Sequence, residues 1–342
     1  MKKNRILFRA DGNSKIGLGH IVRSLSLIEM LQTHFECFFL TRAPEDAIEK
    51  AITQYCSLVQ LESDIKNELE ELFSILNKDD IVVLDGYDFN SEYQKIIRSK
   101  INKLVMIDDK ANHHYYADLI INHGGESLKQ KYSKEGYTKV LAGFSYAVMR
   151  KEFLRAARST RAVSKVDTVY ICIGGSDPFN ITVKALQACI NSHFIKKVYV
   201  VTGSAYNNRT ELLGQIEKGS ADKNIIYAEN INAEGIVQLI SESEIAICSA
   251  SSVAIEACSV RVGLLTGTVV DNQSEIHNQL LDAACCISLG DFKPASSVNI
   301  KTHLAQLCDV TVINNMIKNQ TRAIDGFSGV RLLNEFKMLA AC

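Results

Sequence analysis

Short apolar runs alternate with amphipathic, helix-like stretches along the whole chain, and this alternation restricts the folds that the chain can adopt. Several runs are rich in β-branched residues and apolar at every position, which is typical of strands covered on both faces. Strand followed by helix, repeated many times, predicts an α/β fold with parallel sheets and right-handed crossovers. The expected strands are 6–9, 37–40, 58–61, 81–84, 104–107 and 119–121, then 166–173, 198–202, 225–227, 245–248 and 262–265.

The polar and basic segment 151–165 divides these strands into two series, and we expect it to link two domains. A length of 342 residues and an apolar fraction of 46% suffice for two cores of ordinary size. We predict one Rossmann-like domain over 1–150 and a second over 166–342, the second ending in helices. Because ligands of such sheets bind at the carboxyl ends of the strands, a cleft between two facing domains is the expected site.

Charge and cysteine content narrow the partners and the compartment. The net charge of −1 gives no reason to expect nucleic acid or an anionic membrane as a partner. No apolar run is long enough to cross a bilayer, and the N-terminal apolar stretch is too short and too charged for a signal peptide. The ten cysteines are scattered and form no C-x-x-C pair, as expected for buried thiols in the cytoplasm.

The most informative segment is the glycine loop that follows the first expected strand and opens the first helix. Gly17 and Gly19 remove side chains where the backbone would approach a ligand, and the helix N-terminus suits phosphate. His20 follows in the first turn, where the helix dipole favours the neutral imidazole that acts as a general base. The alternatives are an ordinary turn and a histidine that caps or packs. The dinucleotide fingerprint G-x-G-x-x-G fails, because Val22 occupies the third glycine position.

A second glycine turn follows the first strand of the second series. Gly174 and Gly175 leave backbone amides accessible to a diphosphate, and Ser176 adds a hydroxyl. Asp177 and the proline after it are typical of a helix N-cap and first helical position. The alternative is an ordinary strand-to-helix turn with a good cap.

Two more turns are expected at the same edge of the second sheet. Ser251 and Ser252 follow strand 245–248, and Glu256 stands among apolar residues, where a carboxylate needs a partner such as two ribose hydroxyls. Asn272 and Gln273 follow the next strand. The alternatives are a surface carboxylate for Glu256 and a simple helix N-cap at Asp271 or Asn272.

Together these segments resemble the UDP-sugar hydrolases of pseudaminic acid biosynthesis, which cleave UDP-2,4-diacetamido-2,4,6-trideoxy-β-L-altropyranose into UDP and the free sugar. The resemblance spans almost the whole chain and implies a GT-B-like fold, related to that of the N-acetylglucosaminyltransferase of peptidoglycan assembly. It rests on the segments Phe8-Arg9-Ala10-Asp11, Ile16-Gly17-Leu18-Gly19-His20, Asp85-Gly86-Tyr87, Ile107-Asp108-Asp109, Gly143-Phe144-Ser145-Tyr146, Gly174-Gly175-Ser176-Asp177, Ser249-Ala250-Ser251-Ser252, Glu256-Ala257 and Asn272-Gln273.

The resemblance also implies a role for each matching residue. His20 is the expected base that activates water at the anomeric carbon, Tyr87 orients that base or the water, and Asn272 holds water or sugar. It implies no metal and no cofactor, with a UDP-sugar as the substrate. The residues expected to bind that substrate are Arg9, Asp11, Gly17, Gly19, Asp85, Gly174, Gly175, Ser176, Ser251, Ser252, Glu256 and Gln273.

The acidic residues and histidines of the first half have other possible uses. Asp11, Asp85, Asp108 and Asp109 end strands, where they bind substrate, cap helices or pair with Arg9 or Arg23. A metal site formed with His113, His114 or His123 matches no specific template.

Two other functions remain open at this point. A GT-B glycosyltransferase would release UDP only when an acceptor is present, and a non-catalytic binding protein would hold UDP without turnover. The sequence sets no oligomeric state and is compatible with a monomer.

Overall fold

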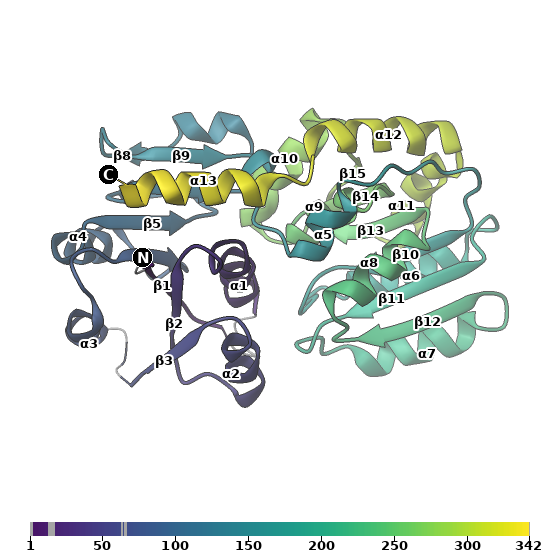
Figure 1. The fold of residues 1–342 in the computed structure, drawn as a ribbon. Helices are drawn as coiled ribbons and strands as arrows, with labels where there is room; N and C mark the ends of the chain where they lie inside the picture. The colour runs from purple at the N-terminus through teal and green to yellow at the C-terminus, as the bar shows by residue number, and fades with distance from the viewer. Residues whose placement is uncertain (1–2, 13–17, 63, 65–66, 342) are drawn as a thin grey trace. The chain divides into compact units, whose positions relative to one another are not determined.

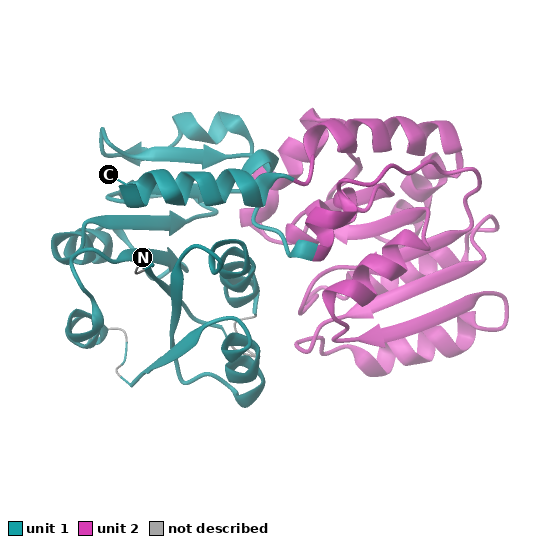
Figure 2. Ribbon diagram, in the orientation of Figure 1, with its two compact units in different colours: residues 1–151, 327–342 teal, residues 152–326 magenta. Residues whose placement is uncertain are grey.

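The computed structural model describes residues 3–12, 18–62, 64 and 67–341. The chain forms two compact units, one made of Met1–Lys151 and Phe327–Cys342 and the other of Glu152–Gly326 (Figure 2). Each unit is built on one large parallel sheet with helices (Figure 1), which confirms the α/β class. Every strand expected from the sequence is found.

The sheet of the first unit has the strand order β3-β2-β1-β4-β5-β7-β9, and all its neighbouring strands are parallel. The short strands β6 and β8 pair separately. The strands are β1 (Arg5–Ala10), β2 (Glu36–Arg42), β3 (Ser57–Leu61), β4 (Ile81–Asp85), β5 (Lys103–Ile107), β6 (His114–Tyr115), β7 (Leu119–Asn122), β8 (Ser133–Lys134) and β9 (Lys139–Ala142). The helices are α1 (Gly19–Leu31), α2 (Asp46–Thr53), α3 (Glu68–Ile75), α4 (Ser91–Lys100) and α13 (Ser328–Ala341), with 3₁₀ turns at Glu126–Gln130 and Phe144–Tyr146.

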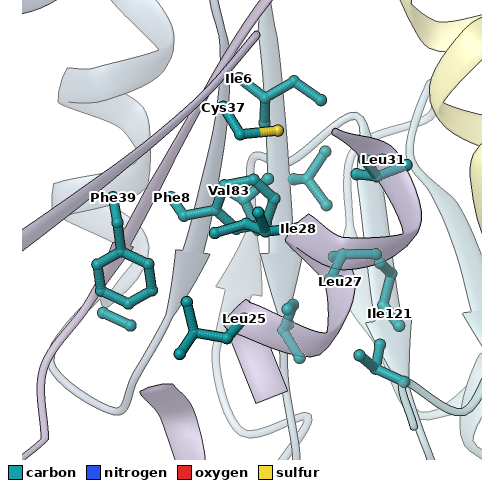
Figure 3. Packing of buried hydrophobic residues seen from close by; sticks show 14 of the residues in the cluster. Ile6, Phe8, Leu25, Leu27, Ile28, Leu31, Cys37, Phe39, Val83 and Ile121 are labelled. Atoms are coloured by element: carbon teal, nitrogen blue, oxygen red, sulfur yellow. The ribbon is translucent and has the colours of Figure 1, made fainter. Parts of the chain in front are cut away.

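Apolar side chains bury both faces of this sheet, as the continuous apolar strands predict. Along β1, Ile6 and Phe8 belong to the core on one face, whereas Leu7 belongs to the core on the other. Leu27 and Ile28 of α1 pack into the first of these cores (Figure 3). This packing fixes α1, and therefore the residues of its first turn, against the sheet.

The last helix belongs to the first unit, which differs from the domain boundaries expected from the sequence. We expected 166–342 to form the second domain, but α13 groups with the first unit. The physical reason is that Leu332 and Phe336 are fully buried in the core that also contains α1. Ser328 adds a hydrogen bond from its hydroxyl to the carbonyl of Ala147.

The sheet of the second unit has the order β12-β11-β10-β13-β14-β15 and is also parallel throughout. Its strands are β10 (Thr168–Cys172), β11 (Lys197–Thr202), β12 (Asn224–Glu229), β13 (Ile245–Ser249), β14 (Gly263–Thr268) and β15 (Ile287–Asp291). Its helices are α6 (Ile181–Ile190), α7 (Arg209–Gly219), α8 (Ala233–Ser241), α9 (Ser252–Ser259), α10 (Ser274–Asp282), α11 (Ser297–Leu304) and α12 (Val310–Ala323), with 3₁₀ turns at Asp271–Gln273 and Ala305–Cys308.

Most of the expected linker 151–165 packs within the second unit. It begins with the helix α5 (Lys151–Ala156). Arg158 then donates to the carbonyl of Gly326, and Arg161 donates to the carbonyls of Ile240 and Ser243. The chain therefore passes from the first unit to the second at 151–152 and returns to the first at 326–327.

In both sheets the strand order reverses once, and these points are where open α/β sheets bind ligands. The reversal lies between β1 and β4 in the first unit and between β10 and β13 in the second. The loops after these four strands carry most of the residues singled out from the sequence. Among the described helices, none combines the length and apolar character needed to span a bilayer.

The position of α13 predicts different costs for two substitutions on that helix. Phe336→Ala should lower the free energy of unfolding of the first unit by about 3–5 kcal/mol, because it leaves a cavity in the core. Met338→Ala, at a side chain that is 52% exposed, should change it by less than about 0.5 kcal/mol. Chemical denaturation measures both, and two equally small effects would contradict the assignment of α13 to this core.

Candidate functional site

His20 lies in the first turn of α1, beside the carboxyl end of β4. Strands β1 and β4 are neighbours, and Ala10 pairs with Asp85, so the loop after β1 begins next to the end of β4. Gly17 is outside the described residues. Gly19 is exposed, and a Cβ added to it would meet nothing within 4 Å. The described residues therefore leave room for a side chain at position 19, and the predicted contact of Gly19 with a ligand stays a prediction.

A short hydrogen bond joins His20 to a buried carboxylate. The Nδ1 atom of His20 is 2.7 Å from Oδ1 of Asp85, whose side chain is 1% exposed. Burial would raise the pKa of Asp85, but the charge of Arg23 and the hydrogen bonds from His20 and Arg23 lower it to about 2. An ionised carboxylate only accepts hydrogen bonds, so Nδ1 of His20 carries the proton. The lone pair of the neutral imidazole is then on Nε2.

Arg23, one turn further along α1, links Asp85 to a second carboxylate. Its Nε donates to Oδ2 of Asp85 at 3.0 Å, and its Nη1 donates to Oδ1 of Asp109 at 2.6 Å. Burial opposes the charge on Arg23, but Asp109 and Asp85 keep its pKa well above the usual value. Asp109 follows β5, so this arginine joins α1 to the ends of two adjacent strands.

Tyr87, two residues beyond the end of β4, lies against His20. The two rings meet edge to face, with centroids 4.9 Å apart and planes at 84°. The Tyr87 hydroxyl donates to Oδ2 of Asp109 at 3.5 Å, and Nζ of Lys110 lies 3.7 Å from the centre of the Tyr87 ring. The structure thus brings His20 and Tyr87, two of the residues predicted to be catalytic, into contact. The Tyr87 side chain is 49% exposed.

Arg9 and Asp11, both predicted to bind substrate, take part in a buried ionic network. Arg9 is 1% exposed and donates to both carboxylate oxygens of Glu68, at 2.7 and 2.6 Å. Asp11 accepts from Arg9 and from the backbone and side chain of Arg42. Burial opposes ionisation of Asp11, but Arg9 and Arg42 hold its pKa well below the usual range. This geometry supports a role in holding the loop after β1, and burial keeps Arg9 from the surface.

The other candidate ligands of the first unit each have a local partner. Asp108 accepts from two backbone amides and from the hydroxyl of Tyr132. His113 bonds to Gln94, and His114 lies 3.0 Å from Glu135. Among the described residues, no group of three or more His, Cys, Asp or Glu side chains is arranged to hold a metal ion.

The glycine turn after β10 has the backbone freedom expected of it. Gly174 has φ +113°, a conformation that other residues rarely adopt. The loop after β11 approaches so closely that a Cβ on Gly203 would lie 2.8 Å from the Cα of Gly175. Sequence reasoning missed Gly203, although a glycine directly after a strand is a usable signal. Gly175 and Ser176 are exposed, which leaves them accessible to a ligand.

Asp177 caps α6, but it lies four residues before the helix begins rather than directly before it, as predicted. We expected the helix to begin at Pro178, but α6 begins at Ile181. The Asp177 carboxylate accepts from the backbone amides of Ile181 and Thr182, at 2.9 and 2.7 Å. The intervening residues form an extra turn, with Asp177 and Asn180 both at positive φ.

The turns after β13 and β14 contain the remaining predicted residues of the second unit. Ser251 caps α9, accepting from the amide of Val253, and Ser252 is exposed. Glu256 is buried one turn into α9. Asn272 and Gln273 lie in a 3₁₀ turn, where Gln273 accepts from the amide of Val269 at 2.7 Å.

Strand register brings these three turns to one edge of the second sheet. Cys172 pairs with Cys248, and Cys248 pairs with Thr266, so β10, β13 and β14 end side by side. Glycine amides, serine hydroxyls and a buried carboxylate are therefore gathered at the point where strand order reverses. The amides and hydroxyls suit a phosphate group, whereas a carboxylate accepts hydrogen bonds from hydroxyl groups.

Titration of His123 predicts how the first unit responds to acid. This buried histidine accepts from the amide of Val148. Burial and the charge of Arg23 lower its pKa to about 4, against the opposing effect of Asp109 and Asp85. The unfolded chain takes up this proton near pH 6.5, so stability should fall by about 3 kcal/mol as the pH drops from about 6.5 to 4.

His123→Gln, which keeps an acceptor for the Val148 amide, should remove this part of the pH dependence. His34→Gln, at an exposed histidine of the same unit, should leave it in place. Urea unfolding at several pH values between 4 and 7 makes the comparison. Parallel curves for the unaltered protein and His123→Gln would contradict the assignment.

No family model matches the chain, whereas individual curated proteins do. It is 28% identical over 288 residues to an uncharacterized protein of Methanocaldococcus jannaschii, across 81% of this chain and 57% of that protein. It is 28% identical over 277 residues to the UDP-2,4-diacetamido-2,4,6-trideoxy-beta-L-altropyranose hydrolase of Campylobacter jejuni, across 79% of this chain and 93% of that protein. The spore coat polysaccharide biosynthesis protein SpsG of Bacillus subtilis is 25% identical over 291 residues, across 82% of each chain. The chain thus spans little more than half the length of the first of these relatives.

Solved glycosyltransferase structures share the fold at much lower identity. MurG of Acinetobacter baumannii has a TM-score of 0.69 at 11% identity, across 98% of this chain and 99% of its own. A UDP-glucosyltransferase from Polygonum tinctorium has a TM-score of 0.72 at 11% identity, across 100% of both chains. Identities this low bear on the fold alone, and they confirm the GT-B-like class. In sequence the chain is a relative of the UDP-2,4-diacetamido-2,4,6-trideoxy-beta-L-altropyranose hydrolase and of SpsG, built on the architecture of the GT-B glycosyltransferases.

Proposed function

We propose that this chain hydrolyses a UDP-activated diacetamido-trideoxy hexose to UDP and the free sugar, in the biosynthesis of a nonulosonic acid such as pseudaminic acid. The observation that carries the proposal is the hydrogen bond from Nδ1 of His20 to the ionised Asp85. The Campylobacter jejuni relative, named as a hydrolase of such a UDP-sugar, supplies the substrate class.

In the proposed reaction, His20 acts as the general base. With its Nδ1 proton held by Asp85, Nε2 accepts a proton from water as the oxygen attacks the anomeric carbon. The bond from that carbon to the phosphate oxygen breaks, and its electron pair leaves with UDP. UDP is a good leaving group, so one base suffices. The Asp85 carboxylate favours the imidazolium that forms, in the way that a buried aspartate does beside other catalytic histidines.

Tyr87 and Asn272 keep supporting roles in this proposal. Tyr87 contacts the His20 ring edge to face, which supports a role in orienting the imidazole or the attacking water. Asn272, in the turn after β14, would hold water or the sugar. No atom changes its oxidation state in this hydrolysis, so the reaction requires no redox cofactor.

The second unit would hold the nucleotide. The exposed residues Gly175 and Ser176, with the serines at the start of α9, support binding of the diphosphate near the N-terminus of that helix. Glu256, buried in the first turns of α9, would accept hydrogen bonds from the ribose hydroxyls. We also propose a cytoplasmic location, since thiols such as Cys189 and Cys248 are buried apolar groups that suit a reducing compartment.

The central prediction concerns UDP release without an acceptor. The protein should release UDP from UDP-2,4-diacetamido-2,4,6-trideoxy-β-L-altropyranose in buffer alone. His20→Gln should lower kcat by about 10²–10⁴-fold, because the general base is lost. Its Kd for UDP should stay within about twofold, as should that of the control His34→Gln, which should also keep its kcat. A wild-type rate in His20→Gln would refute the mechanism, and UDP release only after addition of an acceptor sugar or lipid would indicate a glycosyltransferase.

A second prediction tests the ribose contact. Glu256→Gln should weaken UDP binding by about tenfold or more, because hydrogen bonds to a charged acceptor contribute about 1.5–3 kcal/mol. Removal of a ribose hydroxyl, as in 2′-deoxy-UDP, should weaken binding to the unaltered protein but have little further effect on Glu256→Gln. Glu217→Gln, at an exposed carboxylate of the same unit, is the matched control. Equal losses on removing the hydroxyl from both proteins would take Glu256 out of the ribose site.

A further inference from the structure

Five side chains of the first unit form a ring of successive contacts, which we call the Asp85 cluster: His20, Arg23, Asp85, Tyr87 and Asp109. His20 bonds to Asp85, Asp85 to Arg23 and Arg23 to Asp109. Asp109 accepts from Tyr87, whose ring returns to the imidazole of His20. The members come from α1, from the end of β4 and from the segments that follow β4 and β5.

Arg23 is the member that contacts most of the others. Its Nε and Nη2 both reach Asp85, at 3.0 and 2.5 Å, while Nη1 reaches Asp109 at 2.6 Å. Nη2 also lies 3.3 Å from Nδ1 of His20. A guanidinium provides this fork of donors in a fixed plane, whereas a lysine ammonium cannot span both carboxylates in the same way.

We propose that Arg23 and Asp109 are positioning residues for His20: Arg23 fixes the carboxylate that selects the His20 tautomer, and Asp109 balances the Arg23 charge and holds Tyr87 against the imidazole. The role assigned to His20 rests on the function proposed above, whereas the effect on its tautomer does not. Neither Arg23 nor Asp109 takes part in bond making in that reaction.

The charges around His20 determine what each substitution should do. Asp85 and Asp109 favour the imidazolium, and Arg23 opposes it. Tyr87 is the remaining titratable member of the cluster, and among the described residues His123 and Lys110 lie next to it. Loss of the Arg23 charge should therefore favour protonation of His20, and loss of the Asp109 charge should disfavour it. Damage to the fold alone would not shift protonation in opposite directions.

The kinetic experiment compares kcat/KM across pH for three variants of the cluster. The acid limb of the profile should move to higher pH in Arg23→Gln and to lower pH in Asp109→Asn, because the first loses a positive charge and the second a negative one. Arg23→Lys keeps the charge but not the fork, so kcat should fall by up to about 10²-fold with little change in KM. Arg98→Lys is the control, since Arg98 pairs with Asp118, just before β7, at the opposite end of the strands.

A second experiment follows His20 without any reaction. Nitrogen-15 NMR of protein labelled in its histidine rings should show a single tautomer in the unaltered protein, protonated at Nδ1. Arg23→Gln and Arg23→Lys should show a mixture of tautomers, and the pH midpoints of Arg23→Gln and Asp109→Asn should move as the kinetic profiles do. His20→Gln assigns the signal.

Together, the two experiments distinguish a failure of the positioning role from a failure of the proposed function. If the NMR changes occur but His20→Gln retains activity, the positioning role stands and the proposed function fails. If activity depends on His20 while Arg23→Gln and Asp109→Asn leave both the tautomer and the acid limb unchanged, the positioning role is wrong. Asp109→Asn is nearly isosteric, so it keeps the inference testable even if the Arg23 variants do not fold.

Discussion

An ionised carboxylate buried at the end of a strand requires partners, and the partners of Asp85 organise the candidate site of the first unit. Burial of an unpaired charge is costly, so the native arrangement must supply hydrogen-bond donors to both oxygens. His20, Arg23 and Ser24, all on α1, are those donors. The same contacts fix the rotation of α1, set the His20 tautomer and connect the ends of β4 and β5.

The two units share one sheet architecture but carry different kinds of residues in the turns where the strand order reverses. In each, a parallel sheet reverses its strand order, and the adjacent turns hold the candidate residues. In the first unit, charged and aromatic side chains meet at that point, around the histidine that we propose as the base. In the second, the turns contain glycines and serines, and the loop after β11 approaches so closely that a side chain on Gly203 would clash with the backbone of Gly175. This difference agrees with our proposal that the first unit carries the reaction chemistry and the second binds the nucleotide.

The sequence predicted what depends on local pattern and missed what depends on distant contacts. Buried central strands are continuous apolar runs, and His20 with Tyr87 stood out through their motifs. Strands β9 and β15 were missed because their apolar runs are short or broken: β9 has three apolar residues, and Ser288 and Gly290 interrupt β15. Glu68 looks like any carboxylate of an amphipathic helix, and its bond with Arg9 spans 59 positions. The return of α13 to the first core likewise has no local signal.

The most direct measurement is hydrolysis of UDP-2,4-diacetamido-2,4,6-trideoxy-β-L-altropyranose in ¹⁸O-labelled water, without metal or acceptor, followed by mass spectrometry of both products. Attack of a His20-activated water on the anomeric carbon predicts that the label enters the free sugar and that UDP remains unlabelled. Label in UDP would mean attack at phosphorus. That result would contradict the mechanism built on the His20–Asp85 hydrogen bond.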